Sequence, residues 1–212
     1  MKRVFISGTA PREVGKYLHE SGYEVFTVSA SPSMHCLISS HPDIFICSVG
    51  REPVFANTAE IGSEYPQNAA FCAAALDRYF IHNLNITAPR LLEIAERAGL
   101  KPVHVNQGYT KCSCAVVDGK SVITSDKGIA RALIALGDVD VLEVNKGHIL
   151  LPGYQYGFIG GASGRVGEEF VFCGDITVHS DFERIQDFVE SRGVRLKWFD
   201  FPLTDVGSII EE

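Results

Sequence analysis

One pattern of apolar and polar positions recurs along this chain: two short apolar strands, an amphipathic helix and a third strand. Its clearest copy covers residues 112–148, where Asp118-Gly119 is a two-residue turn typical of hairpins. Asp126 can cap the helix, whose apolar residues recur every three or four positions, and Gly137 ends it. The predicted strands of this copy are residues 112–117, 121–124 and 139–144. The pattern predicts a ββαβ unit.

The same pattern occurs one repeat earlier, in residues 71–109. There Asp77 takes the place of Asp118, and Gly99 ends the helix in the place of Gly137. The two copies end in similar tetrapeptides, Asn106-Gln107-Gly108-Tyr109 and Asn145-Lys146-Gly147-His148. Repeats of this size are typical of stacked or radial architectures.

The rest of the chain supplies three less complete copies. Residues 4–28 read as strand, helix and strand, and residues 43–56 read as a hairpin whose helix is replaced by the loop 57–68. Residues 169–199 again read as strand, helix and strand. Several helices end in a glycine just before a strand, which predicts positive φ angles at Gly99, Gly137 and Gly193.

These copies amount to five units. The first unit has no hairpin of its own, so we expect the C-terminal strand, residues 206–210, to complete it by pairing with residues 3–6. A ring closed in this way has no exposed sheet edge. The sequence therefore predicts a single α/β domain, residues 1–212, built as a five-unit, pseudo-symmetric α/β-propeller of ββαβ modules. The runner-up is an open, doubly wound sheet, which the many hairpins disfavour because parallel strands need crossover connections.

Composition narrows the possible partners. Of 212 residues, 46% are apolar, which suits one sizeable core, and the net charge of −7 argues against a nucleic-acid partner. No apolar run is long enough for a membrane span or a signal peptide. The six cysteines lie mostly in apolar strands, as reduced cysteines do, so we expect a cytoplasmic protein. The turn at Ser7-Gly8 lacks a Gly-x-Gly-x-x-Gly pattern, so no cofactor is expected.

Two groups of residues have the chemistry of metal ligands. His35, Cys36 and His41 lie in one loop, but without a matching second pair the sequence favours a polar loop. Cys112 and Cys114 point to the same side of a predicted strand. A zinc or redox role is the alternative there, and packing in the core is favoured. No metal is expected.

A five-unit ring of ββαβ modules resembles the pentein fold. That fold is shared by the guanidino-group-modifying enzymes, such as deiminases, dimethylaminohydrolases and amidinotransferases, and by a ribosomal anti-association factor. The resemblance covers the whole chain as a repeat pattern, whereas its local motifs are short. It implies a site at a central channel, built from three stretches of the chain.

All three stretches have a counterpart here, with changed residues. Asn68 stands where the family has a carboxylate that binds the guanidinium, and Asp205 stands where it has a nucleophilic cysteine. His148 keeps the family's general acid/base histidine. The counterparts read Tyr65-Pro66-Gln67-Asn68, Gly147-His148-Ile149-Leu150 and Leu203-Thr204-Asp205. The resemblance thus implies His148 and Asp205 as the catalytic pair and Asn68 as a substrate-binding residue.

Two more residues join this candidate site. Tyr109 is the repeat equivalent of His148, so we expect both at the channel mouth together with Asn68 and Asp205. Arg165 follows a glycine-rich stretch and is a candidate for binding a phosphate-like group. We expect His148 and Asp205 within one water-bridged hydrogen bond of each other, with no cysteine thiol beside them. The alternative for His148 is that it only caps a strand end.

The changed residues weaken the family's usual chemistry. Attack on an amidine carbon needs a thiolate, which Asp205 does not provide, and the amide of Asn68 loses the charged pair with a guanidinium. We interpret the chain as a divergent, non-hydrolytic pentein-like protein that binds a small polar molecule or a protein partner at its central channel. The alternative is an active deiminase- or amidinotransferase-like enzyme, cleaving C–N bonds of guanidino compounds, with Cys72 or Cys114 as the nucleophile.

Overall fold

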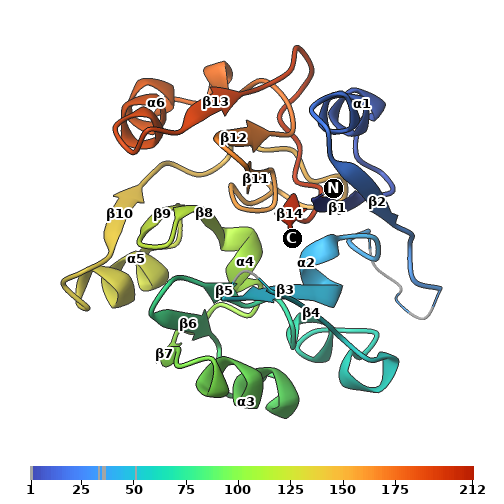
Figure 1. Ribbon diagram of the computed structural model, residues 1–212, viewed down its shortest axis with the longest axis vertical. Helices are drawn as coiled ribbons and strands as arrows, with labels where there is room; N and C mark the ends of the chain where they lie inside the picture. Colours follow the sequence, from blue (N-terminus) through green and yellow to red (C-terminus); the bar gives the residue numbers. More distant parts are fainter. Residues whose placement is uncertain (1, 33, 35–36, 51) are drawn as a thin grey trace.

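The computed structural model describes residues 2–32, 34, 37–50 and 52–212. Within these residues it is a mixed α/β structure with six α-helices and five small sheets. Figure 1 shows the sheets arranged about a common centre, with the longer helices outside and two short helices near the centre. The outer helices are α1 (Arg12–Glu20), α3 (Pro89–Arg97), α5 (Lys127–Ile134) and α6 (Phe182–Glu190), and the inner ones are α2 (Pro42–Phe45) and α4 (Thr110–Ser113).

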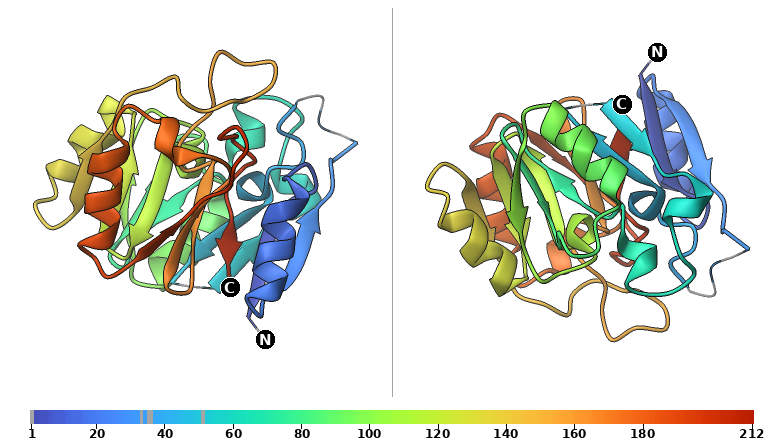
Figure 2. Two further views of the ribbon diagram at one scale, coloured as in Figure 1. Left: turned by 90° about the horizontal axis from the view of Figure 1, so that it is seen from above. Right: turned by 90° about the horizontal axis from the view of Figure 1, so that it is seen from below.

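The first sheet joins the two ends of the chain, which lie close together (Figures 1 and 2). Strand β1 (Arg3–Ser7) pairs in parallel with β2 (Glu24–Val28) and antiparallel with β14 (Ile210–Glu211). This pairing confirms the expected contact between the C-terminal and N-terminal strands. The C-terminal strand is shorter than predicted, because Gly207 and Ser208 turn the chain before it begins, with φ angles of 76° and 73°.

Three further sheets have the ββαβ order, in which a third strand runs parallel to the second strand of an antiparallel hairpin. The sequence predicted this order for the first two, whereas it missed the first strand of the third. Their strands are β5 (Ala74–Ala75), β6 (Tyr79–His82) and β7 (Lys101–His104); β8 (Cys114–Asp118), β9 (Ser121–Thr124) and β10 (Asp140–Glu143); and β11 (Ser163–Val166), β12 (Glu169–Phe172) and β13 (Arg195–Lys197). The fifth sheet is the hairpin of β3 (Ile46–Val49) and β4 (Glu52–Phe55). Short 3₁₀ turns are η1 (Thr58–Glu60), η2 (Gln67–Ala69) and η3 (Ile176–Val178).

Three hairpin strands begin later than the sequence pattern predicted, and one of them is β5, which starts at Ala74 and not at Phe71. Residues 43–45 belong to helix α2 and residues 112–113 to helix α4, so the other two strands start at Ile46 and Cys114. Pro42 favours the first of these turns, because its fixed φ angle suits the start of a helix. Each of these helices is four residues long, which is about one turn.

The helix ends behave as predicted. The φ angles are 81° at Gly99, 82° at Gly137 and 70° at Gly193. A residue with a side chain is strained in this left-handed conformation, whereas glycine adopts it readily and lets the chain reverse into the next strand.

The apolar faces of the outer helices pack on the sheets. Ile129 and Leu133 of α5, for example, are fully buried together with Val122 of β9. The long connection between β10 and β11, gold to orange in Figure 2, projects from one face of the molecule before it returns to the centre. Among the described residues, no helix has the length and apolar character needed to cross a membrane.

Candidate functional site

Four segments that lead into strands meet at the centre of the structure and are joined by main-chain hydrogen bonds. They are α2, α4, the glycine-rich turn before β11 and the turn before β14. The bonds run from the N–H of Gly161 to the carbonyl of Cys112 (2.9 Å), from Ser208 to Gly161 (2.8 Å) and from Asp43 to Gly207 (3.1 Å). A further bond joins Lys111 to Cys72 (2.9 Å). The fold therefore fixes the backbone from which the central side chains project.

Asp43, on α2, is a fully buried polar residue of this cluster. Its Oδ2 accepts hydrogen bonds from the hydroxyl of Ser208 (2.7 Å) and from the thiol of Cys112 (2.8 Å). Its Oδ1 is buried and has no hydrogen-bond partner among the described residues. Most buried polar atoms are satisfied, because an unpaired one costs about 1–3 kcal/mol. This oxygen therefore needs an explanation.

Asp205 lies on the neighbouring turn and is also buried. Its carboxylate accepts the backbone N–H of Phe158 (2.9 Å) and of Gly207 (3.0 Å), and its Oδ1 lies 3.8 Å from Nδ1 of His41. Burial raises the pKa of Asp205 to about 6, although the nearby His41 acts in the opposite direction. A side chain at Gly161 would place its Cβ 2.0 Å from Oδ1 of Asp205, so glycine is required there.

Two cysteines extend the cluster. The sulfur of Cys112 lies 3.8 Å from that of Cys72, and both residues are buried. The hydrogen bond with Cys72, burial and the charge of Asp43 together raise the pKa of the Cys112 thiol well above its ordinary value. This thiol therefore stays protonated at neutral pH and donates a hydrogen bond to Oδ2 of Asp43.

Ser208 and Lys111 connect the cluster to the rest of the centre. Ser208 has a positive φ angle of 73°, a strained conformation for a residue with a side chain. Its hydroxyl lies within hydrogen-bonding distance of Asp43 and of the carbonyl of Gly160 (2.9 Å). The half-buried Lys111 donates from Nζ to the same hydroxyl at 3.1 Å. Hydrogen bonds thus connect the ammonium of Lys111, the hydroxyl of Ser208 and the carboxylate of Asp43 in series.

His41, Asp43 and Cys112 bring three kinds of metal-ligating atom together. One nitrogen, one carboxylate oxygen and one sulfur all lie within 4.8 Å of one another. The sequence favoured a polar loop at His41, and the structure does place it in the loop just before α2, but it buries the side chain beside Asp43 and Asp205. His35 and Cys36, the other candidates in that loop, lie outside the described residues.

A family match covers much of this centre. The model of a family of unknown function, DUF6873, matches residues 52–210. The chain belongs to the DUF6873 family. The matched span contains Cys72, Cys112 and Asp205 and begins after His41 and Asp43. No curated protein matches the chain.

The residues singled out by the resemblance lie in three places and do not form one cluster. Asn68 is buried, and its Oδ1 accepts the hydroxyl of Tyr109 at 2.9 Å, so the structure brings these two predicted residues together. The ring of Tyr65 packs against Tyr109, with 5.7 Å between their centroids. Asp205 lies in the central cluster.

His148 has a different neighbour. Its ring packs on that of His179, with 4.5 Å between the centroids. The pKa of His179 is lowered mainly by burial of its ring and, to a smaller extent, by the neighbouring His148. The stretches of His148 and Asp205 do run side by side, because the N–H of Asp205 donates to the carbonyl of Leu150 at 2.8 Å. Among the described residues, however, the ion pair of Asp205 is with His41. A water-bridged contact between His148 and Asp205 stays a prediction.

Arg165 lies on β11 and contacts backbone. It donates to the carbonyls of Gly167 (2.5 Å) and Val117 (3.3 Å), which joins two neighbouring hairpins. These contacts involve none of the central residues. Its role in binding a substrate stays a prediction.

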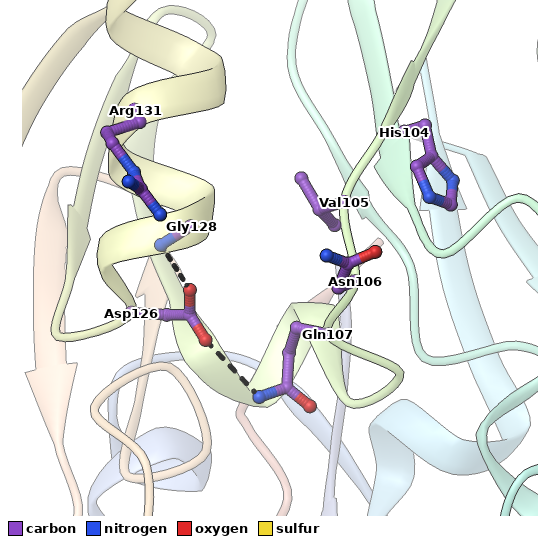
Figure 3. Close-up of a pocket in the computed structure, with 7 residues that line it drawn as sticks. All are labelled: His104, Val105, Asn106, Gln107, Asp126, Gly128 and Arg131. Carbon is purple, nitrogen blue, oxygen red and sulfur yellow. Dashed lines mark hydrogen bonds between the residues drawn. The ribbon is translucent and has the colours of Figure 1, made fainter.

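A pocket of about 380 Å³ lies elsewhere, between the end of β7 and the start of α5 (Figure 3). Its acidic residue, Asp126, is engaged in capping α5, since Oδ1 accepts the N–H groups of Gly128 (2.8 Å) and Ile129 (3.0 Å). The other oxygen faces Gln107 at 3.5 Å. Because the carboxylate has this structural role, we place the candidate site at the centre.

The sequence names His41, Cys72, Cys112 and Asp205 as candidates, but it misses Asp43, Lys111 and Ser208. His41 and Asp43 were assigned to a loop and to the start of a strand, and Ser208 to the middle of a strand. Cys112 was paired with Cys114 on one strand face, whereas the structure places Cys112 in α4. The polar runs that precede the hairpins were the available signal, because a buried strand rarely begins with several polar residues.

Proposed function

We propose that this chain is a five-unit α/β-propeller of the pentein kind that binds a small polar molecule at its centre without hydrolysing guanidino compounds. Support for the ring comes from three ββαβ sheets, one hairpin sheet and a sheet that joins the two chain ends. Their arrangement about a common centre is the one that a propeller requires (Figure 1).

The observation that carries the binding proposal is the meeting of donors and acceptors at the centre. Asp43 and Asp205 offer carboxylate oxygens, and Lys111 and Ser208 offer an ammonium and a hydroxyl. These groups come from three separate segments that main-chain hydrogen bonds hold in place. Such a set suits a ligand that itself offers both a donor and an acceptor, such as a ureido or amide group, better than a bare guanidinium.

The geometry around Cys112 argues against hydrolysis. Its thiol donates a hydrogen bond to Asp43, so its proton is held by a carboxylate and not removed by a base. Asp205, where the pentein enzymes have their cysteine, is held by two backbone N–H groups and has no sulfur to offer. Nucleophilic attack on a guanidino carbon requires a thiolate with an adjacent base.

Two assays test this proposal. In the first, the purified chain is incubated with L-arginine, agmatine and a methylated arginine, and we expect neither ammonia nor a ureido product. In the second, calorimetry compares L-citrulline with L-arginine, which differ only in the terminal group. We expect saturable binding of L-citrulline that is lost in Asp43→Asn, a variant whose amide keeps an acceptor for Ser208. Binding of neither compound would refute the proposed ligand class.

A second candidate function rests on one observation. Cys112 lies within 4.8 Å of a ring nitrogen of His41, and that ring lies 3.8 Å from Asp205. Cysteine, histidine and aspartate in this order are the parts of a cysteine hydrolase. The nucleophile would then be Cys112, and not Cys72 or Cys114. Turnover that disappears in Cys112→Ser and persists in Cys114→Ser would favour this enzyme over the binding protein.

A further inference from the structure

We infer that His41, Asp43 and Cys112 bind one divalent cation of the zinc type at the centre of the ring. The inference deepens the proposed function and rests on it only in placing the ligand at this centre. None of the three residues is more than 4% exposed, and their ligating atoms lie within 4.8 Å of one another. A single ion is small enough to bind between three buried side chains.

The unpaired oxygen of Asp43 is the independent observation. Oδ2 already accepts hydrogen bonds from Ser208 and Cys112, whereas Oδ1 is buried with no hydrogen-bond partner in the described part of the chain. An uncompensated buried carboxylate oxygen is costly. A cation bound at Oδ1 would satisfy it and would neutralise the charge that α2 brings into the core.

The position of Asp205 supports the same assignment. Metal-bound histidines commonly turn their other ring nitrogen towards a carboxylate, which fixes the ring and strengthens the ligand. Oδ1 of Asp205 lies 3.8 Å from Nδ1 of His41 and is itself held by the N–H of Gly207. Nε2 of His41 is therefore the nitrogen left for the ion.

The chemistry of the three atoms selects the ion. Calcium and magnesium prefer oxygen ligands, whereas a set of imidazole, carboxylate and thiolate is typical of zinc. With bonds of about 2.0–2.3 Å, ligand atoms on one tetrahedral zinc lie about 3.3–3.8 Å apart, so shifts of about 1 Å bring these three onto one ion. Binding would release the thiol proton of Cys112 and leave Ser208 donating to Asp43.

Three protein ligands leave a fourth position open on a tetrahedral ion. Sites of this kind accept a water molecule or a polar ligand there. Lys111 and Ser208 lie beside Asp43 and are joined by a hydrogen bond of 3.1 Å. They are placed to hold the group that occupies the fourth position, which connects the cation with the small polar ligand proposed above.

The test uses the full chain, reduced and freed of metal with a chelator. We expect one equivalent of Zn²⁺ in calorimetry, a rise in Tm with Zn²⁺, and a sulfur-to-metal absorption band in the near ultraviolet with Co²⁺. Cys112→Ser should lose that band, and His41→Gln and Asp43→Asn should weaken Zn²⁺ binding by about tenfold or more. The control Cys114→Ser, a buried cysteine two residues away, should behave as the unmodified chain.

Several results would overturn the inference. One is that the unmodified chain binds neither Zn²⁺ nor Co²⁺ stoichiometrically. Another is that Cys112→Ser binds Co²⁺ with an unchanged spectrum. A third is that Cys114→Ser loses metal binding as fully as Cys112→Ser does. Circular dichroism of each variant shows whether it is folded. If Cys112→Ser does not fold, the loss of Zn²⁺ binding is tested with Asp43→Asn instead. L-citrulline binding in the presence of chelator separates the two proposals: if it persists where Zn²⁺ binding fails, only the cation site is refuted.

Discussion

The buried histidine His82 makes the stability of this protein depend on pH in a way that can be calculated. It lies on β6 with its Nε2 2.9 Å from the carbonyl of Gly108 and its Nδ1 2.8 Å from the hydroxyl of Thr87. In the neutral ring Nε2–H donates to the carbonyl of Gly108, and Nδ1 faces the hydroxyl of Thr87, which also lies 3.1 Å from the carbonyl of Asn83. Burial of the ring lowers the pKa of His82 from 6.5 to about 4.

The direction and the size of the change in stability with pH follow from the lowered pKa of His82. Below pH 6.5 the unfolded chain takes up a proton at His82, whereas the folded protein does so only near pH 4. The contribution of His82 to stability is therefore complete above about pH 6.5 and is lost progressively as the pH falls towards 4. At about 1.4 kcal/mol for each pH unit, the loss over this window is about 3 kcal/mol.

Urea unfolding of the native chain and of His82→Gln, measured at several pH values across this window, tests the calculation. The amide of the variant keeps a donor for Gly108 but does not titrate. The native chain should be the more stable of the two at neutral pH, and its advantage should shrink by about 3 kcal/mol on going to pH 4. Other titrating groups affect both proteins alike and cancel. A constant difference across the window would show that His82 is not held neutral in the fold.

Three further perturbations test other parts of the structure. Gly161→Ala should lower the free energy of unfolding by about 2 kcal/mol or more, because the new Cβ would lie 2.0 Å from Oδ1 of Asp205. An unchanged midpoint of urea unfolding would contradict this contact. Gly137→Val should cost about 1 kcal/mol or more through its φ angle of 82°, and an unchanged Tm would argue against a left-handed helix end. The thiol of Cys112 should react with iodoacetamide only after unfolding, since it is buried and bonded to Asp43; rapid labelling of the folded protein, detected by mass spectrometry, is the contrary result.

The sequence predicted the repeating part of the fold because local pattern and packing agree there. Hairpins, amphipathic helices and helix-ending glycines each leave a signal of their own, and Gly99, Gly137 and Gly193 were assigned correctly on that basis. The pairing of β1 with β14 is not local. It was predicted because the first unit lacked a hairpin, which left only the C-terminal strand to complete it.

The central cluster was harder to predict because its residues are far apart in the chain and come from short, irregular turns. Asp43 and Ser208 are 165 positions apart and share a hydrogen bond. A single turn of helix, such as α2 or α4, is too short to show helical periodicity, so its residues were read as the beginning of the strand that follows. Asp205 was found only through the resemblance to a family motif, and its partner His41 carried no motif at all.

The central site depends on the part of the chain that precedes the family match. The match begins at residue 52, whereas His41 and Asp43 lie before it and reach the centre through α2. The N–H of Asp43 donates to the carbonyl of Gly207, so the turn before β14 is held by the same residue whose carboxylate meets Cys112. Strand β14 then pairs with β1, which closes the first sheet. The turn at Gly207 and Ser208 thus links the two features, because it contacts Asp43 of α2 in the central cluster and leads directly into the strand that pairs with β1.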